Sequence, residues 1–219
     1  MRKVVQILAI VGFCAAVASA QLITDDEDAQ SWNEIQLTAP LSKSFDFYTA
    51  VSMRFGKNVT RLTDGRFAIG VVWKPTTSFS VSPFYLTVRA RNSRGGFRQE
   101  NRLNLRATYR FPIKSFGLTH RSTYEYRMRA PENTWRYRGA LTFEKALPKK
   151  FISDARFFIG DEVFYDSATG KFSRNRFNIG IGRTLNKNLA VDVSYIRQND
   201  GYSHPGDLNI ISVTWRVKL

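Results

Sequence analysis

Arginines and carboxylates at every second position give this chain its clearest capacity for chemistry. Within residues 102–111, Arg102, Arg106 and Arg110 share one face, because successive side chains of a strand point to opposite sides. A guanidinium binds carboxylate or phosphate groups through paired N–H donors. The spacing predicts anion-binding groups that would line the lumen of a barrel. The candidate lumen-lining residues are Arg89, Arg91, Arg102, Arg106, Arg110, Arg121, Glu125, Arg127, Arg129, Arg136, Arg138, Glu144, Arg156, Glu162 and Arg176, with Arg54, Asp192 and Arg216 on further strands.

A second constellation is His120 and Ser122, two positions apart on the apolar face of one strand. In an outer-membrane lipid hydrolase with a His-x-Ser pair, the histidine takes the serine proton and a third polar group orients the imidazole. Glu132 and Asn133 follow about ten residues later, and at ~3.3 Å per residue they would lie at the opposite end of the strand. We therefore expect no catalytic residue and no enzyme activity, with this hydrolase as the less favoured alternative.

Cofactor and metal sites are not indicated. His204 lies in a loop of Gly, Pro and Asn without a second histidine, and no set of residues has metal-ligand spacing. Gly180 and Gly182 alternate with isoleucines within a strand pattern, which favours relief of a crowded wall over a nucleotide-binding loop. We expect neither a metal nor a cofactor.

The elements that would position these residues are long strands. Alternation of apolar and polar residues marks 45–55, 66–74, 84–91, 102–111, 118–129, 135–144 and 211–219, and more loosely 155–164, 176–183 and 189–198. Such strands exceed the usual globular length of ~5–6 residues and meet the ~9–11 that a tilted membrane strand needs. Aromatic residues cluster beside the connections, as interfacial girdles do. The pattern predicts an all-β fold, a single antiparallel transmembrane β-barrel of about 10–12 strands.

The strand count and the connections leave alternatives open. Ten strands follow from Phe45 onward, and residues 32–38 form an eleventh pattern. Either a twelfth strand precedes it, or this segment packs against or inside a ten-stranded wall. Short turns at 75–77, 112–115, 147–150 and 185–188 alternate with long polar stretches at 56–65, 92–101, 166–175 and 199–207. This alternation predicts periplasmic turns at one end and longer outer loops at the other.

The first residues indicate export. Arg2 and Lys3 precede an apolar run at 4–16, and Ala18-Ser19-Ala20 forms a small-residue cleavage site. We predict a signal peptide at 1–20, an acidic N-terminal segment at 21–31 and the barrel at 32–219. The only cysteine, Cys14, lies in the signal, so the mature chain would have no disulfide or thiol chemistry.

The net charge of the chain narrows the classes of partner that it could bind. The net charge of +15 falls to +13 when Arg2 and Lys3 are removed with the signal. An exported chain rarely meets nucleic acid, and the arginines alternate along strands rather than forming a basic tail or helix. We expect a bacterial outer-membrane protein, exported through the periplasm, with outer-membrane lipid and lipopolysaccharide as partners, anionic small solutes as candidate ligands, and no nucleic acid.

Four stretches carry a resemblance to a known family: RQENRLNLRATYRF, THRSTYEYRMRAPENTWRYRGALTFEKAL, SRNRFNIGIGRTLNKN and VSYIRQND. They resemble domain of unknown function 2490 (DUF2490), a family of small outer-membrane barrels of diderm bacteria. The resemblance covers most of the mature chain and implies fold and location, without a reaction or a ligand. A more distant likeness, of architecture alone, is to narrow twelve-stranded channels for acidic oligosaccharides.

Two functions compete for the polar face. Arginines outnumber carboxylates, and unpaired guanidiniums need water or an anion, which favours a narrow, arginine-lined, anion-preferring pore. Small barrels also fill with side chains, and arginine–glutamate pairs could plug the interior of a structural or adhesion barrel that transports nothing. The open width of the lumen would decide between the two.

Overall fold

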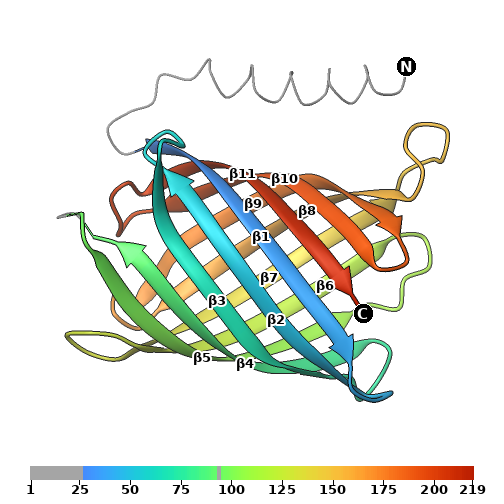
Figure 1. Cartoon of the computed structure of the whole chain (residues 1–219), viewed down its shortest axis with the longest axis horizontal. Helices are drawn as coiled ribbons and strands as arrows, with labels where there is room; N and C mark the ends of the chain where they lie inside the picture. Colours follow the sequence, from blue (N-terminus) through green and yellow to red (C-terminus); the bar gives the residue numbers. More distant parts are fainter. Residues whose placement is uncertain (1–26, 93–94) are drawn as a thin grey trace.

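The computed structural model describes residues 27–92 and 95–219, and its regular elements are eleven β-strands (Figure 1). Their bounds are β1 Glu27–Pro40, β2 Phe45–Gly56, β3 Arg61–Trp73, β4 Phe79–Arg91, β5 Phe97–Arg110, β6 Gly117–Met128, β7 Thr134–Ala146, β8 Ala155–Asp166, β9 Lys171–Asn186, β10 Leu189–Asp200 and β11 Asp207–Lys218. The described residues contain no helix long and apolar enough to span a membrane. The predicted signal peptide at 1–20 lies outside the described residues.

The strands form one closed barrel in which each strand pairs with its neighbours in sequence. Closure joins β1 to β11, which lie side by side in Figure 1. Glu27 lies opposite Asp207, and Thr38 lies opposite Lys218. Antiparallel neighbours alternate in direction, so the first and eleventh strands run the same way and this pair is parallel. Eleven lies within the predicted range of 10–12. Both finer predictions, a twelfth strand or a segment packed on a ten-stranded wall, are wrong because β1 is itself part of the wall.

The two ends of the barrel have connections of similar length. We call the end where β1 begins the N-terminal end; its connections are 57–60, 92–96, 129–133, 167–170 and 201–206. The end where β11 stops is the C-terminal end, with connections 41–44, 74–78, 111–116, 147–154 and 187–188. The predicted alternation of short turns and long loops is therefore wrong. Strand pairing continues through the polar residues that had indicated loops, and it also takes residues 27–31 of the expected acidic segment into β1.

The apolar face of the strands turns outward. On β5, the side chains of Leu103 and Leu105 are 53% and 52% exposed, whereas Arg102 and Asn104 between and beside them are 7% and 5% exposed. A barrel that binds ligands in water places these faces the other way round. An apolar outer wall around a polar interior is the arrangement that lipid requires.

The faces of β4 differ from the prediction. Phe84 and Val88 point into the barrel and are buried, and Arg89 and Arg91 lie on the opposite, outer face. Both faces of β4 carry apolar side chains, so its own alternation does not identify the inner one. Pairing decides it, because Phe84 lies opposite Asn104, which is buried inside.

Glycines of β9 make room for the filled interior. A Cβ at Gly180 would lie 2.6 Å from Phe158 Cζ, and one at Gly182 would lie 2.3 Å from Asp192 Oδ1. These contacts are shorter than side chains tolerate, so β9 needs glycine where residues of β8 and β10 cross the lumen. The predicted role of the two glycines in a crowded wall agrees with this packing.

Candidate functional site: the lumen

A network of ion pairs crosses the middle of the lumen. Arg138 donates to Glu125 Oε1 at 2.8 Å and to Glu162 Oε1 at 2.7 Å, which joins β6, β7 and β8. Arg121 reaches Glu162 at 3.1 Å, and Arg102 reaches the other oxygen of Glu125 at 3.4 Å. Glu125 is only 1% exposed. The carboxylates at this level are therefore shared between guanidiniums and shielded from solvent.

The same arrangement continues toward the N-terminal end. Glu100 accepts from Arg102 and from Arg127, both at 2.6 Å. Asp166 accepts from Arg127 at 3.0 Å and from Arg136 Nε at 2.9 Å. Each of these carboxylates again contacts two guanidiniums, and Arg127 is itself shared between Glu100 and Asp166.

A smaller network lies toward the C-terminal end. Arg156 bridges Glu144 at 3.1 Å and Asp192 at 2.8 Å, and Arg216 also reaches Asp192, at 2.6 Å. Arg110 lies 3.4 Å from Glu144, and its side chain is 65% exposed. Arg110 therefore stands at the mouth of the barrel rather than within it.

Aromatic rings face the guanidiniums inside the lumen. Four of them lie over Phe164 at 4.7–5.8 Å from the ring centroid, namely Arg136, Arg138, Arg174 and Arg176. Trp32 of β1 contacts Arg54 at 3.4 Å and Arg176 at 4.9 Å. The negative face of a ring stabilises a nearby cation by ~1–2 kcal/mol when water is excluded, which helps to hold so many arginines together.

Inside the lumen, Arg54 and Arg106 have no carboxylate partner among the described residues. The Nε atoms of Arg54 and Arg106 are buried and make no hydrogen bond. Arg106 lies over the Phe84 ring at 4.7 Å, as Arg54 lies over Trp32. A buried N–H group without an acceptor is destabilising, so these sites would favour a bound anion or water.

The structure places most of the predicted lumen residues inside the barrel. Arg102, Arg106, Arg110, Arg121, Glu125, Arg127, Arg136, Arg138, Glu144, Arg156, Glu162 and Arg176 share the inner face, with Arg54, Asp192 and Arg216. Arg89 and Arg91 were predicted to line the lumen, but they lie on the outer wall. Arg129 follows the last residue of β6 and lies in the 129–133 connection, where its amide donates to Asn133. Burial lowers the pKa of the Arg129 guanidinium, and the charge of Arg127 acts in the same direction.

Several acidic partners were missed by sequence reasoning. Asp64, Glu100, Asp166 and Asp200 fall in stretches that had been predicted as loops, yet they lie in β3, β5, β8 and β10. Asp200, for example, accepts from Arg174 Nε at 2.6 Å. The excess of inward arginines over inward carboxylates is therefore smaller than the prediction assumed. Continuing the two-residue alternation past each expected strand end, as from Arg102 to Glu100, would have found them.

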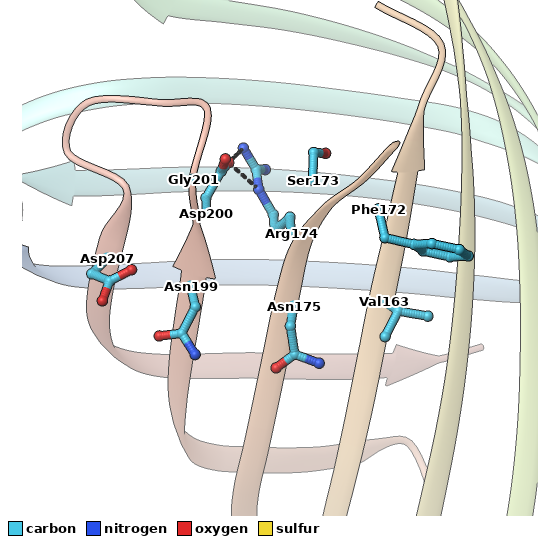
Figure 2. A pocket seen from close by; sticks show the side chains of 9 residues that line it. All are labelled: Val163, Phe172, Ser173, Arg174, Asn175, Asn199, Asp200, Gly201 and Asp207. Carbon is cyan, nitrogen blue, oxygen red and sulfur yellow. Dashed lines mark hydrogen bonds and ion pairs between the residues drawn. The ribbon is translucent and has the colours of Figure 1, made fainter. Parts of the chain in front are cut away.

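Two hollows differ in their relation to the lumen. One of about 140 Å³ lies inside, next to Trp32, Arg121, Glu162, Arg176 and Asn178. A larger one, about 660 Å³, lies at the N-terminal end of β8–β11, where Val163, Asn175, Asn199 and Asp207 form one row on the outer face beneath the Arg174–Asp200 pair (Figure 2). The larger hollow is thus lined both by outward side chains and by the inward Arg174–Asp200 pair, whereas the smaller one lies among the lumen residues.

The His120 and Ser122 side chains do meet. His120 Nε2 lies 3.0 Å from Ser122 Oγ on the outer face, and Ser122 Oγ lies 2.9 Å from the Tyr137 hydroxyl. Asn133, in the connection at the N-terminal end, instead donates to the Tyr126 hydroxyl at 3.2 Å. Asn133 therefore bonds at the far end of the strand from His120, where its position in the sequence had predicted it. The described residues also contain no cluster of three His, Cys, Asp or Glu that could hold a metal ion.

The chain is similar to two solved porins and to one protein family. A NanC porin, solved in a rhombohedral crystal form, is similar with a TM-score of 0.48 and 13% identity, over 83% of this chain and 93% of that one. An anion-selective porin from Comamonas acidovorans is similar with a TM-score of 0.40 and 11% identity, over 80% of this chain and 54% of that one. A search of curated proteins found no match. The sequence matches the family described as "Protein of unknown function (DUF2490)" over residues 29–209, from β1 into β11, and the chain therefore belongs to the DUF2490 family.

Proposed function

We propose that the protein is an integral barrel of the bacterial outer membrane and that its lumen is a narrow pathway for small anions. The location is supported by the apolar outer wall and by strands of 12 to 16 residues, long enough to cross a membrane at a tilt. In the proposed orientation the C-terminal end lies at the periplasm and the N-terminal end faces outward.

The observation that carries the anion preference is a pair of inward arginines that have no carboxylate partner among the described residues. Arg54 and Arg106 both face inward with a buried, unbonded Nε, and Arg121 and Arg176 line the inner hollow of about 140 Å³. A negatively charged solute would satisfy these donors, whereas a cation would meet guanidiniums without compensation.

The pathway is restrictive at mid-height. Thr123, Glu125, Phe164 and Ile210 are almost completely buried, so side chains fill the section between the two mouths. Passage would require local movement of the ion-paired side chains. We therefore expect small conductance rather than the open channel of a wide porin.

Planar-bilayer recordings in a KCl gradient test this proposal. The reversal potential should indicate anion preference, and Arg106→Gln should reduce it because one unpartnered inward charge is removed. Arg183→Gln is the matched control, since Arg183 lies on the outer face at the C-terminal end, where its guanidinium contacts Ser153. Absence of conductance, or preference for cations, would overturn the pore.

The second candidate is a structural or adhesion barrel with a plugged interior. The continuity of the network from Glu100 to Glu162 favours it, because shared buried ion pairs hold neighbouring strands together. This alternative predicts no ion flow in the wild type and in Arg106→Gln alike. It also predicts that shortening the outward 201–206 connection alters cell-surface contacts.

A further inference from the structure

The outer wall carries a basic patch of its own, formed by Arg89 and Arg91 of β4. Their places are fixed by pairing, since Arg89 lies opposite Gly65 and Gln99, and Arg91 lies opposite Phe97. Arg89 is exposed. No carboxylate of the described residues forms an ion pair with either arginine, so neither charge serves the lumen network.

The surroundings of the patch are shaped for a polar group on the outside of the wall. A side chain at Gly65 would have nothing within 4 Å, so the wall beside Arg89 is bare. On the other side, Gln99 donates to Asn101 at 3.2 Å, and Thr87 donates to the same oxygen at 3.0 Å. A headgroup could therefore approach the Arg89 guanidinium closely and find further hydrogen-bonding groups beside it.

Arg91 is held in place by backbone carbonyl groups of β3 and of the connection between β4 and β5. It donates from Nε to the Leu62 carbonyl at 3.2 Å and from Nη1 to the Gly95 carbonyl at 2.6 Å. Its guanidinium lies 4.5 Å from the centroid of the Phe97 ring, and Phe97 is 45% exposed. A fixed guanidinium next to an exposed ring offers charge and apolar contact together, which suits an amphipathic ligand.

The height of the patch corresponds to lipid headgroups. On β6–β8, Tyr124, Trp135 and Tyr165 stack at 5.9 and 5.5 Å, as residues of an interfacial girdle do. Leu103 of β5 lies opposite Tyr126, which itself lies opposite Trp135 of this group, and Gln99 lies four residues nearer the N-terminal end. At ~3.3 Å per residue, the patch stands roughly 10 Å beyond the girdle once strand tilt is included, outside the apolar belt.

We propose that Arg89 and Arg91 bind a phosphate group of lipopolysaccharide in the outer leaflet. Among the described residues, the unpaired positive charge at this end of the outer wall lies on the β4 side. On the far side of the barrel, the outward Arg197 is paired with Glu27 at 2.8 Å and with Asp207 at 2.7 Å. Guanidiniums match phosphate in paired hydrogen bonds, and outer-leaflet lipid A carries its phosphates at headgroup depth. The inference rests on the outer-membrane location and orientation proposed above, but not on the pore.

Native mass spectrometry of the full mature chain in non-ionic detergent tests the site, with bisphosphorylated lipid A as the probe. The wild type should hold one lipid, and the double variant Arg89→Gln with Arg91→Gln should bind about tenfold more weakly. Dephosphorylated lipid A should bind the wild type as weakly as phosphorylated lipid A binds the double variant. Arg89→Lys, which keeps the charge without the planar fork, should give an intermediate affinity.

Arg183→Gln serves as the control for net charge, because it removes an outward arginine at the opposite end of the barrel. The proposal is overturned if the double variant binds as well as the wild type, if Arg183→Gln loses as much affinity, or if removing the phosphates has no effect. It is also overturned if phosphatidylglycerol or inorganic phosphate, at a phosphate concentration equal to that of lipid A, displaces the bound lipid A. Circular dichroism confirms folding of each variant, and an unchanged conductance in the double variant separates this site from the pore.

Discussion

The substitution Glu162→Gln isolates the contribution of the central ion-pair network. The Glu162 carboxylate accepts from Arg121 at 3.1 Å and from Arg138 at 2.7 Å, and it lies 3.9 Å from Arg176. Glutamine keeps the size of the side chain and removes its charge. Arg138 retains Glu125, whereas Arg121 and Arg176 lose their only carboxylate among the described residues.

The expected loss of stability in Glu162→Gln follows from the burial of the ion pairs that Glu162 forms. Removing one partner of a buried pair costs about 3–5 kcal/mol. The Arg121 side chain is 40% exposed, so solvent screens its part of the loss, and Arg176 is distant. We expect the free energy of unfolding to fall by about 2–3 kcal/mol, measured by urea titration in lipid bilayers. The reversal potential should also move toward stronger anion preference, because the lumen loses one negative charge.

Asp161→Asn is the matched control, with the same change of charge one residue away. The Asp161 carboxylate lies on the outer face and accepts from Asn175 at 2.8 and 2.9 Å. A stability loss for Glu162→Gln no larger than that for Asp161→Asn would refute the reasoning, since the network would then contribute nothing beyond a surface charge.

Three further perturbations address the wall and its outer face. Gly180→Ala should lower the free energy of unfolding by about 1–3 kcal/mol, because its Cβ would lie 2.5 Å from the Val193 carbonyl oxygen. Gly65→Ala, where the added Cβ would meet open space, should change the free energy of unfolding by less than about 1 kcal/mol. Parallel urea titrations compare the two variants. Ser122→Ala should leave hydrolysis of phospholipid and lipid A at the wild-type background, and a turnover that disappears in this variant would instead establish the His120–Ser122 pair as catalytic. The double variant Asn33→Cys with Val213→Cys should form a disulfide under oxidation, because these residues are paired across the closure. Met53→Cys with Val213→Cys should not, because β1 separates the two positions. A cross-link of the second pair on a non-reducing gel would contradict the eleven-stranded wall.

The sequence was sufficient for the fold class because two-residue alternation is a local property. Leu103 and Arg102 differ in environment through their positions in one strand, and no distant contact is needed to assign them. The faces of β4 could not be assigned in this way. Phe84 and Val88 oppose Tyr85 and Arg89, so apolar side chains occur on both sides, and only the pairing with β3 and β5 determines which side is inside.

The strand count and strand ends depend on long-range pairing. Residues 32–38 alternate like any strand, but whether they join the wall depends on β11, at the other end of the chain. Polar residues such as Glu100 and Asp166 resemble loop residues in isolation, although each continues a strand because arginines on neighbouring strands satisfy it. The ends of strands in this barrel are therefore set by partners that the local sequence does not contain.

Sharing of carboxylates between arginines bears on which anions the proposed pathway would suit. Glu125, Asp166 and Asp192 each hold two arginines, so each guanidinium already has an oxygen acceptor in place. In the proposed pathway, an entering anion would either bind Arg54 or Arg106, whose Nε atoms are unbonded, or replace an internal carboxylate at a shared arginine. A carboxylate or phosphate group offers the same paired oxygens and can make that exchange with similar geometry, whereas chloride accepts at a single point. In the pathway proposed above, the packed network would therefore favour stepwise exchange of oxyanions over free diffusion of halide, and such exchange would be compatible with a filled interior.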